Sequence, residues 1–384
     1  MHAVFRHAAL SAAAFSALAG PAGAETILRG QFRTGVELND NMRLREDNRE
    51  TDAKFTVSPG LTLTTRDADT SLDLGGSVTA IRYWDRSEFN KEDFNFSANL
   101  RQKFLTAEAG LAARFARATL LGNEEEDDLG AGNGETQSDT ISITPSLGWQ
   151  IGLLDKLDFS LGATDVSYSG GGDYTGYRRY QGSATWSHSV TQRFVLIGTL
   201  LGDRYEGDNE FIANGAGVTG GFSYALTPLT DLKATAGARA TRNYPDGGDN
   251  STEMDWLASA SLTYRPEIGR YSVTLDRSVE PSNGGGLKVR NQLKLGAVMP
   301  ITQRLSFDPN ARVQYTEKSD AGGSDDSRLL MEISPALSYR LDKDLSVTGT
   351  LRHQRLSYGG GGGDRVSNAA LVMLSWSPAL LVDR

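Results

Sequence analysis

Cysteine is absent from all 384 residues of the chain. The protein therefore has no disulfide, no thiolate metal site and no cysteine that could carry a lipid anchor. Proline is also scarce, at 11 residues, and no apolar run approaches the ~18 residues that a membrane-spanning helix requires. If this chain crosses a membrane, it does so with β-strands.

Basic residues are outnumbered by acidic ones, 39 to 48, which gives a formal net charge of −9. This balance argues against nucleic acid as a partner. The glycine runs, such as Gly359–Gly363, lack the strand-to-helix context and the Lys-Ser/Thr pair of a phosphate-binding loop. We therefore expect no cofactor.

Residues 1–24 differ from the rest of the chain. They begin with Arg6 and His7, continue with an apolar stretch from Ala8 to Ala19, and end with the small residues 22–24. These are the parts of a secretory signal peptide, which we expect to be removed after Ala24. Residues 25–384 are then expected to form one domain.

Apolar and polar residues alternate along most of this domain. In Leu287–Ala297 the apolar residues fall on one face, and Lys288, Arg290 and Lys294 fall on the other. A soluble β-sandwich would also alternate, but its strands average ~5 to 6 residues and rarely carry charges at mid-strand. Strands of roughly 11 residues or more match a tilted membrane-spanning strand. We predict an all-β fold, an antiparallel up-and-down transmembrane β-barrel.

Short turns and longer polar loops alternate between these stretches, as at the periplasmic and extracellular ends of an outer-membrane barrel. Their number predicts about 18 strands, with 16 as the alternative. The longest loop, Ala118–Thr136, is acidic. It is a solvated tip, a divalent-cation site that bridges to lipopolysaccharide, or a segment that folds into the lumen, and the sequence leaves these three interpretations open.

Aromatic residues gather at strand ends, where amphipathic rings would meet the membrane interfaces. They predict two girdles in contact with outer-membrane lipid and lipopolysaccharide. The girdle residues are Trp84, Trp149, Tyr224, Trp256, Tyr264, Tyr339 and Trp376.

Four prolines lie in the middle of predicted strands. Because proline donates no backbone hydrogen bond, each predicts a bulge or a missing ladder bond. The positions are Pro59, Pro145, Pro309 and Pro335.

The segments Gly35–Met42, Phe55–Leu63 and Ile333–Val347 resemble the β-barrel porin 2 family. They are also similar to related outer-membrane proteins that accompany exopolysaccharide and exosortase-type systems. The resemblance implies a bacterial outer-membrane barrel that acts as a porin or as a surface-polysaccharide accessory, with no catalytic residues. The implied partners are the outer-membrane assembly machinery and polysaccharide-export components.

Two histidines follow the signal peptide, His188 and His353, and no third histidine completes a metal site. A barrel hydrolase would need a neighbouring serine or acid beside one of them, near the outer rim. Ser187 and Ser189 flank His188, but neighbours in a strand point to opposite faces. We interpret both histidines as lumen or interface residues and predict no catalytic or metal site.

A barrel of about 18 strands is too wide for side chains to fill, so it leaves an aqueous channel unless a segment plugs it. We therefore expect a porin-like diffusion channel for small hydrophilic solutes. The alternatives are an accessory of exopolysaccharide export and a barrel-embedded hydrolase. The predicted pore-lining residues are Arg239, Lys288, Arg290, Lys294, Arg312, Arg340, Asp73, Asp158, Asp255, Asp276, Asp308 and Glu332.

Overall fold

The computed structural model describes residues 24–120, 136–170, 174–245, 249–318, 327–359 and 363–383. The predicted signal peptide, apart from Ala24, lies outside these residues, as do the acidic segments 124–128 and 320–326. Among the described residues, one short 3-10 helix, η1 (Ser87–Phe89), interrupts an otherwise all-β chain, and no helix is long and apolar enough to cross a membrane.

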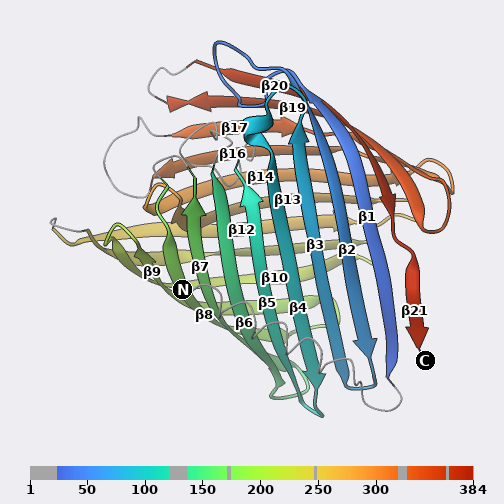
Figure 1. Cartoon of the computed structure of the whole chain (residues 1–384). Coiled ribbons are helices and arrows are strands. Elements are labelled where there is room, and N and C mark those ends of the chain that lie inside the picture. Colours follow the sequence, from blue (N-terminus) through green and yellow to red (C-terminus); the bar gives the residue numbers. More distant parts are fainter. Residues whose placement is uncertain are drawn as a thin grey trace, which may run out of the picture.

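The strand segments follow one another along the chain and are shown in Figure 1. They are β1 (Glu25–Asn39), β2 (Asp52–Arg66), β3 (Thr70–Tyr83), β4 (Lys91–Lys103), β5 (Ala107–Thr119), β6 (Gln137–Gln150), β7 (Asp155–Ser169), β8 (Tyr177–Ser189), β9 (Phe194–Gly207), β10 (Ile212–Thr227), β11 (Thr230–Tyr244), β12 (Ser251–Tyr264), β13 (Arg270–Ser282), β14 (Gly286–Pro300), β15 (Leu305–Asp308), β16 (Asn310–Lys318), β17 (Arg328–Ile333), β18 (Ala336–Arg340), β19 (Leu345–Tyr358), β20 (Arg365–Trp376) and β21 (Ala379–Asp383).

These 21 segments form one closed barrel of 18 antiparallel strands. The wall closes where β1 pairs with β20 and β21, so the blue and red ends of the chain lie side by side (Figure 1). Three barrel strands are each divided into two segments, at Pro309, at Pro335 and at Ser377–Pro378. The predicted fold and strand number are confirmed.

Each of the four mid-strand prolines interrupts a ladder. Between β2 and β3, Val57 pairs with Ala80 and the next pair is Gly60 with Ser77, so the ladder skips Pro59. The β6–β7 ladder skips Pro145 in the same way, and Pro309 and Pro335 divide their strands. The register continues unchanged across each break. The predicted missing ladder bonds are therefore confirmed, and they arise without an inserted residue.

The outer face of the barrel is apolar, with exposed side chains such as Leu161, Leu200 and Leu351. Because strands alternate, the opposite face of each strand points into the barrel. Fully buried side chains occur mainly toward the end with the long loops, and examples are Leu44, Tyr205, Leu330 and Leu356. An empty lumen would leave such side chains exposed, so chain segments must fill part of the lumen at this end.

Candidate functional site: a constriction inside the barrel

One filling segment is the end of the β13–β14 hairpin, residues 278–290, which we name the inner hairpin. Its Val279, Leu287 and Val289 are buried against Tyr205 and Ala213 of β9 and β10. Strand alternation would place these three side chains on the outer face of the wall. They pack instead on the inner face of β9 and β10, and the inner hairpin therefore lies inside the barrel.

The tip of the inner hairpin is tied to neighbouring loops by hydrogen bonds. The backbone N–H of Thr175 donates to the carbonyl oxygen of Asn283 at 2.8 Å, and Asn209 Nδ2 donates to the Gly285 carbonyl oxygen at 3.3 Å. Gly285 has φ +82°, and a Cβ atom there would lie 2.6 Å from Asn209 Nδ2 and 2.9 Å from Thr175 Oγ1. The turn at this tip therefore requires glycine.

A cavity of about 420 Å³ lies between the inner hairpin and the inner wall formed by β5 to β8. Its charged lining consists of Arg114, Arg179, Lys288, Arg290 and Glu280. Four cations and one carboxylate give this lining a positive charge, and we name it the cationic cavity. A confined space of one sign concentrates oppositely charged solutes.

Ion pairs neutralise only part of this positive charge. Arg290 Nη2 lies 2.6 Å from Glu280 Oε1 on the same hairpin, and Arg179 Nε lies 3.8 Å from an oxygen of Asp203. Arg114 is exposed, and within the described part of the chain no ion pair involves it. Arg114 is therefore the lining cation best placed to meet an incoming anion.

A second inward segment, residues 40–51, connects β1 to β2, and we name it the inner loop. Its Leu44 is buried against Leu330 and Leu356 of β17 and β19. Its base is held by the buried Asn41, whose Nδ2 donates to the carbonyl oxygens of Arg45 at 2.7 Å and Val366 at 2.9 Å. The Leu44 contacts bring the inner loop onto the inner wall.

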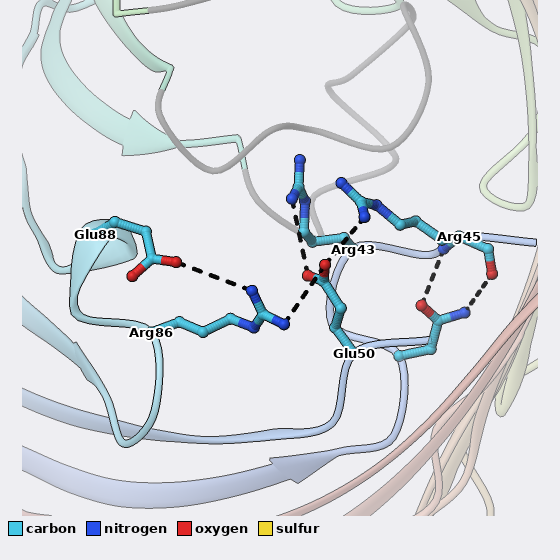
Figure 2. Close-up of polar contacts among 6 residues, drawn as sticks. Arg43, Arg45, Glu50, Arg86 and Glu88 are labelled. Carbon is cyan, nitrogen blue, oxygen red and sulfur yellow. Dashed lines mark hydrogen bonds and ion pairs between the residues drawn. The ribbon is translucent and has the colours of Figure 1, made fainter. Parts of the chain in front are cut away.

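Figure 2 shows charged residues of the inner loop together with Arg86 and Glu88 of the β3–β4 connection. The Glu50 carboxylate lies 3.0 Å from Arg45 Nη1, 3.5 Å from Arg86 Nη2 and 3.8 Å from Arg43 Nη1. Arg86 also lies 3.9 Å from Glu88. Three guanidinium groups thus surround one nearly buried carboxylate, and with Glu88 included the cluster has an excess of one positive charge.

The structure brings several of the predicted pore-lining residues together. Arg239 is buried opposite Asp255 in the β11–β12 register, and its Nη2 lies 3.0 Å from Asp203 Oδ2. Lys294, Arg312 and Glu332 are successive register partners on β14, β16 and β17, and Arg312 pairs with Glu332 at 3.0 Å. The inner face therefore carries one ion pair here, Arg312 with Glu332, beside the second cation Lys294.

The remaining predicted lining residues are not among those that line the cationic cavity. Asp73 accepts a hydrogen bond from Thr64 Oγ1 at 2.9 Å, and Asp158 pairs with Lys156 at 2.6 Å. Asp308 accepts from Ser306 at 3.2 Å, and Arg340 is exposed near a short turn. Asp276 lies opposite Gln292 in the β13–β14 register. A lumen-lining role for these five stays a prediction.

All seven predicted girdle aromatics are exposed, from Tyr224 at 37% to Trp84 at 74%. Their contact with lipid stays a prediction.

The two histidines have ordinary polar partners. His188 Nδ1 lies 2.8 Å from Asp155 Oδ1, and its ring stacks on Trp186. His353 Nδ1 lies 2.8 Å from Asn368 Oδ1. Within the described ranges, no cluster of three or more His, Asp or Glu side chains could hold a metal ion.

Sequence reasoning did not single out Arg114, Arg179 or the arginines of the inner loop. Their role depends on two segments that turn inward, and inward folding leaves little trace in a pattern of alternation. One signal was present at the inner hairpin. Pro281 lies near the end of β13, and proline in a sheet favours an edge, which is what β13 becomes there.

Three comparisons relate this chain to known proteins. No curated protein sequence matches it significantly. Solved structures with a similar fold include OpdO of Pseudomonas aeruginosa, with 11% identity, a TM-score of 0.52 and coverage of 93% of this chain and 98% of that chain. Another is OccK2 (OpdF) of the same organism in complex with glucuronate, with 12% identity, a TM-score of 0.51 and coverage of 93% and 98%.

OccAB3 of Acinetobacter baumannii is also similar, with 8% identity, a TM-score of 0.51 and coverage of 94% of this chain and 100% of that chain. At these identities the likeness concerns the fold. A family model described as "Protein of unknown function, DUF481" matches residues 132–334, more than half of the chain. The protein therefore belongs to the DUF481 family.

Proposed function

We propose that this protein is a porin-like diffusion channel of the bacterial outer membrane that admits small hydrophilic solutes and prefers anions. The observation that supports a channel function is the closed 18-strand barrel with an apolar outer face. Barrels of 16 to 18 strands leave an aqueous lumen because side chains cannot fill the interior. The inner hairpin and the inner loop would narrow this lumen near its long-loop end.

The preference for anions rests on the charge of the constriction. The cationic cavity contributes four cations and one carboxylate, and the cluster around Glu50 adds three arginines and two carboxylates, Glu50 and Glu88. Rings of basic side chains favour anions in pores. OccK2, which shares this fold, was crystallised with glucuronate, which is a sugar acid and therefore an anion.

We infer a channel rather than a hydrolase because of the partners of the two histidines. His188 pairs with an aspartate beside a short turn and His353 with an asparagine amide, and neither contact supplies a nucleophile. An accessory role in exopolysaccharide export is not favoured by the comparisons. Export through the predicted signal peptide and insertion by the outer-membrane assembly machinery complete the proposal.

The test is conductance of the refolded protein in a planar lipid bilayer under a salt gradient. We expect stepwise openings that neutral sugars reduce according to their size, and a zero-current potential on the anion-selective side. A folded barrel that conducts no ions would overturn the channel. Stable conductance with cation selectivity would overturn only the preference for anions.

A further inference from the structure

The wall of the barrel is incomplete between β12 and β13. The two strands pair from Tyr264 and Tyr271 at the short-turn end up to Ala258 and Arg277. Beyond that point β12 continues to Ser251 and β13 to Ser282, yet none of these residues pair across the gap. We name this unpaired stretch the seam. At the seam the β13 edge of the inner hairpin has separated from β12, while on its other edge β14 stays paired with β16 as far as Lys288 and Lys318.

Arg277 covers the start of the seam. Its Nε donates to the backbone carbonyl oxygen of Trp256 at 3.2 Å, and its Nη1 donates to Asn291 Oδ1 at 2.8 Å. The Trp256 carbonyl belongs to the free edge of β12, where a β13 amide would otherwise donate. Unpaired backbone groups are costly at a membrane, and a guanidinium group replaces the missing ladder bond.

The sequence of the inner hairpin also suits a place in the wall. If the β12–β13 register continued, Ser278 would lie opposite Leu257, Val279 opposite Trp256 and Glu280 opposite Asp255. Val279, Leu287 and Val289 would then point outward beside Trp256, while Lys288 and Arg290 would still point inward. The apolar face that now packs on Tyr205 would face lipid. The same alternation of apolar and polar residues therefore suits the hairpin both inside the barrel and in the wall.

Two features favour the inward position that the structure shows. In the wall, Glu280 would lie directly opposite Asp255, and like charges in a cross-strand pair repel. Pro281 has no N–H to donate to β12. Inside the barrel, the hairpin instead gains the apolar contacts with Tyr205 and Ala213 and the hydrogen bonds at its tip.

We propose that the inner hairpin is a gate with two positions: the inward one, and one in the wall, where it completes the β12–β13 ladder and widens the lumen. The gate rests on the proposed channel function, but the exchange between positions is testable by itself. Because Lys288 and Arg290 belong to the inner hairpin while Arg114 and Arg179 belong to the wall, outward movement takes the cationic cavity apart.

The absence of cysteine makes a disulfide test clean. The pair Thr175→Cys with Asn283→Cys would lock the inward position, because the backbones of these residues are already hydrogen-bonded at 2.8 Å. The pair Glu253→Cys with Ser282→Cys would lock the hairpin in the wall, because the continued register makes them partners. Ser261→Cys with Thr274→Cys is the matched control, since these residues are partners in the paired part of the same strands.

Each full-length double variant is reconstituted in bilayers, oxidised, and scored by mass for disulfide formation and by conductance. We expect both locks to close, with the wall lock giving at least about twofold higher conductance than the inward lock and reductant restoring the original value. Failure of the wall lock to close under conditions that close the control pair would overturn the gate. A closed wall lock with unchanged conductance would also overturn it.

If both locks close but no variant conducts ions, the channel function is contradicted, while the two positions of the hairpin are still supported. The single-cysteine variants, which form no intramolecular disulfide, control for the substitutions themselves. The two proposals can therefore fail separately.

Discussion

Arg277 and Trp256 face each other across the point where the β12–β13 ladder ends. The guanidinium carbon lies 4.5 Å from the centroid of the indole ring, and Nε donates to the carbonyl oxygen of the same tryptophan at 3.2 Å. Nη2 also lies 3.9 Å from Asp255 Oδ1. Alternation puts Trp256 on the outer face and Asp255 on the inner face, so one arginine contacts groups on both sides of the wall.

Replacing Arg277 by Met should destabilise the barrel, because the carbonyl of Trp256 loses its donor and the ring loses its cation. We expect the free energy of unfolding to fall by about 2 kcal/mol. Urea unfolding in lipid vesicles, followed by tryptophan fluorescence, measures this change. Arg242→Met is the control, since Arg242 lies over the Tyr244 ring at 5.2 Å within a fully paired strand. An equal loss in both variants would contradict a special role for the seam.

Arg114→Gln should weaken the preference for anions without closing the pore. The substitution removes one lining charge of the cationic cavity and leaves the ion pair of Arg290 with Glu280 in place. We expect the zero-current potential to move toward the cation-selective side, and the effect to shrink near 1 M salt, where the screening length is about 3 Å.

Arg193→Gln, at a short turn, is the control for Arg114→Gln and should leave the potential unchanged. If both variants shift the potential equally, net charge rather than the cationic cavity sets selectivity.

Glu50→Gln should move the zero-current potential in the opposite direction. Glu50 is the shared partner of Arg43, Arg45 and Arg86, so its loss leaves three guanidinium groups without this carboxylate. We expect a stronger preference for anions and a less firmly held inner loop, seen as faster cleavage by added protease. Glu108→Gln, near a short turn, is the matched control. No change in either measurement would show that the cluster does not face the permeating ions.

The sequence predicts the wall of this barrel far better than its interior. Alternation, strand length and the effect of proline depend on neighbours along the chain and on adjacent strands. The interruptions of the ladder at Pro59 and Pro145 could therefore be predicted from the sequence. The inward position of the inner hairpin could not be predicted, because Val279, Leu287 and Val289 give the same apolar pattern whether they face lipid or pack on Tyr205. The lining role of Arg114 likewise depends on a hairpin that is distant from it in sequence.

Gly285→Ala should loosen the inner hairpin. Gly285 has φ +82°, which costs an L-residue roughly 1 kcal/mol, and the new Cβ would press on Asn209 and Thr175, the residues that hold the tip. The turn keeps its backbone in both positions, but the contacts with Asn209 and Thr175 exist only in the inward one, which should therefore lose about 1 kcal/mol relative to the wall position.

In the Glu253→Cys, Ser282→Cys background, this loss predicts faster closure of the wall lock by about fivefold or more at a fixed oxidant concentration. Gly220→Ala in β10 is the control, because a Cβ there meets no atom within 4 Å. Equal closure rates in the two backgrounds would mean that Gly285 does not hold the hairpin inward. A selective acceleration by Gly285→Ala would tie the gate to the geometry of this single turn, since the substitution leaves every charge of the constriction in place.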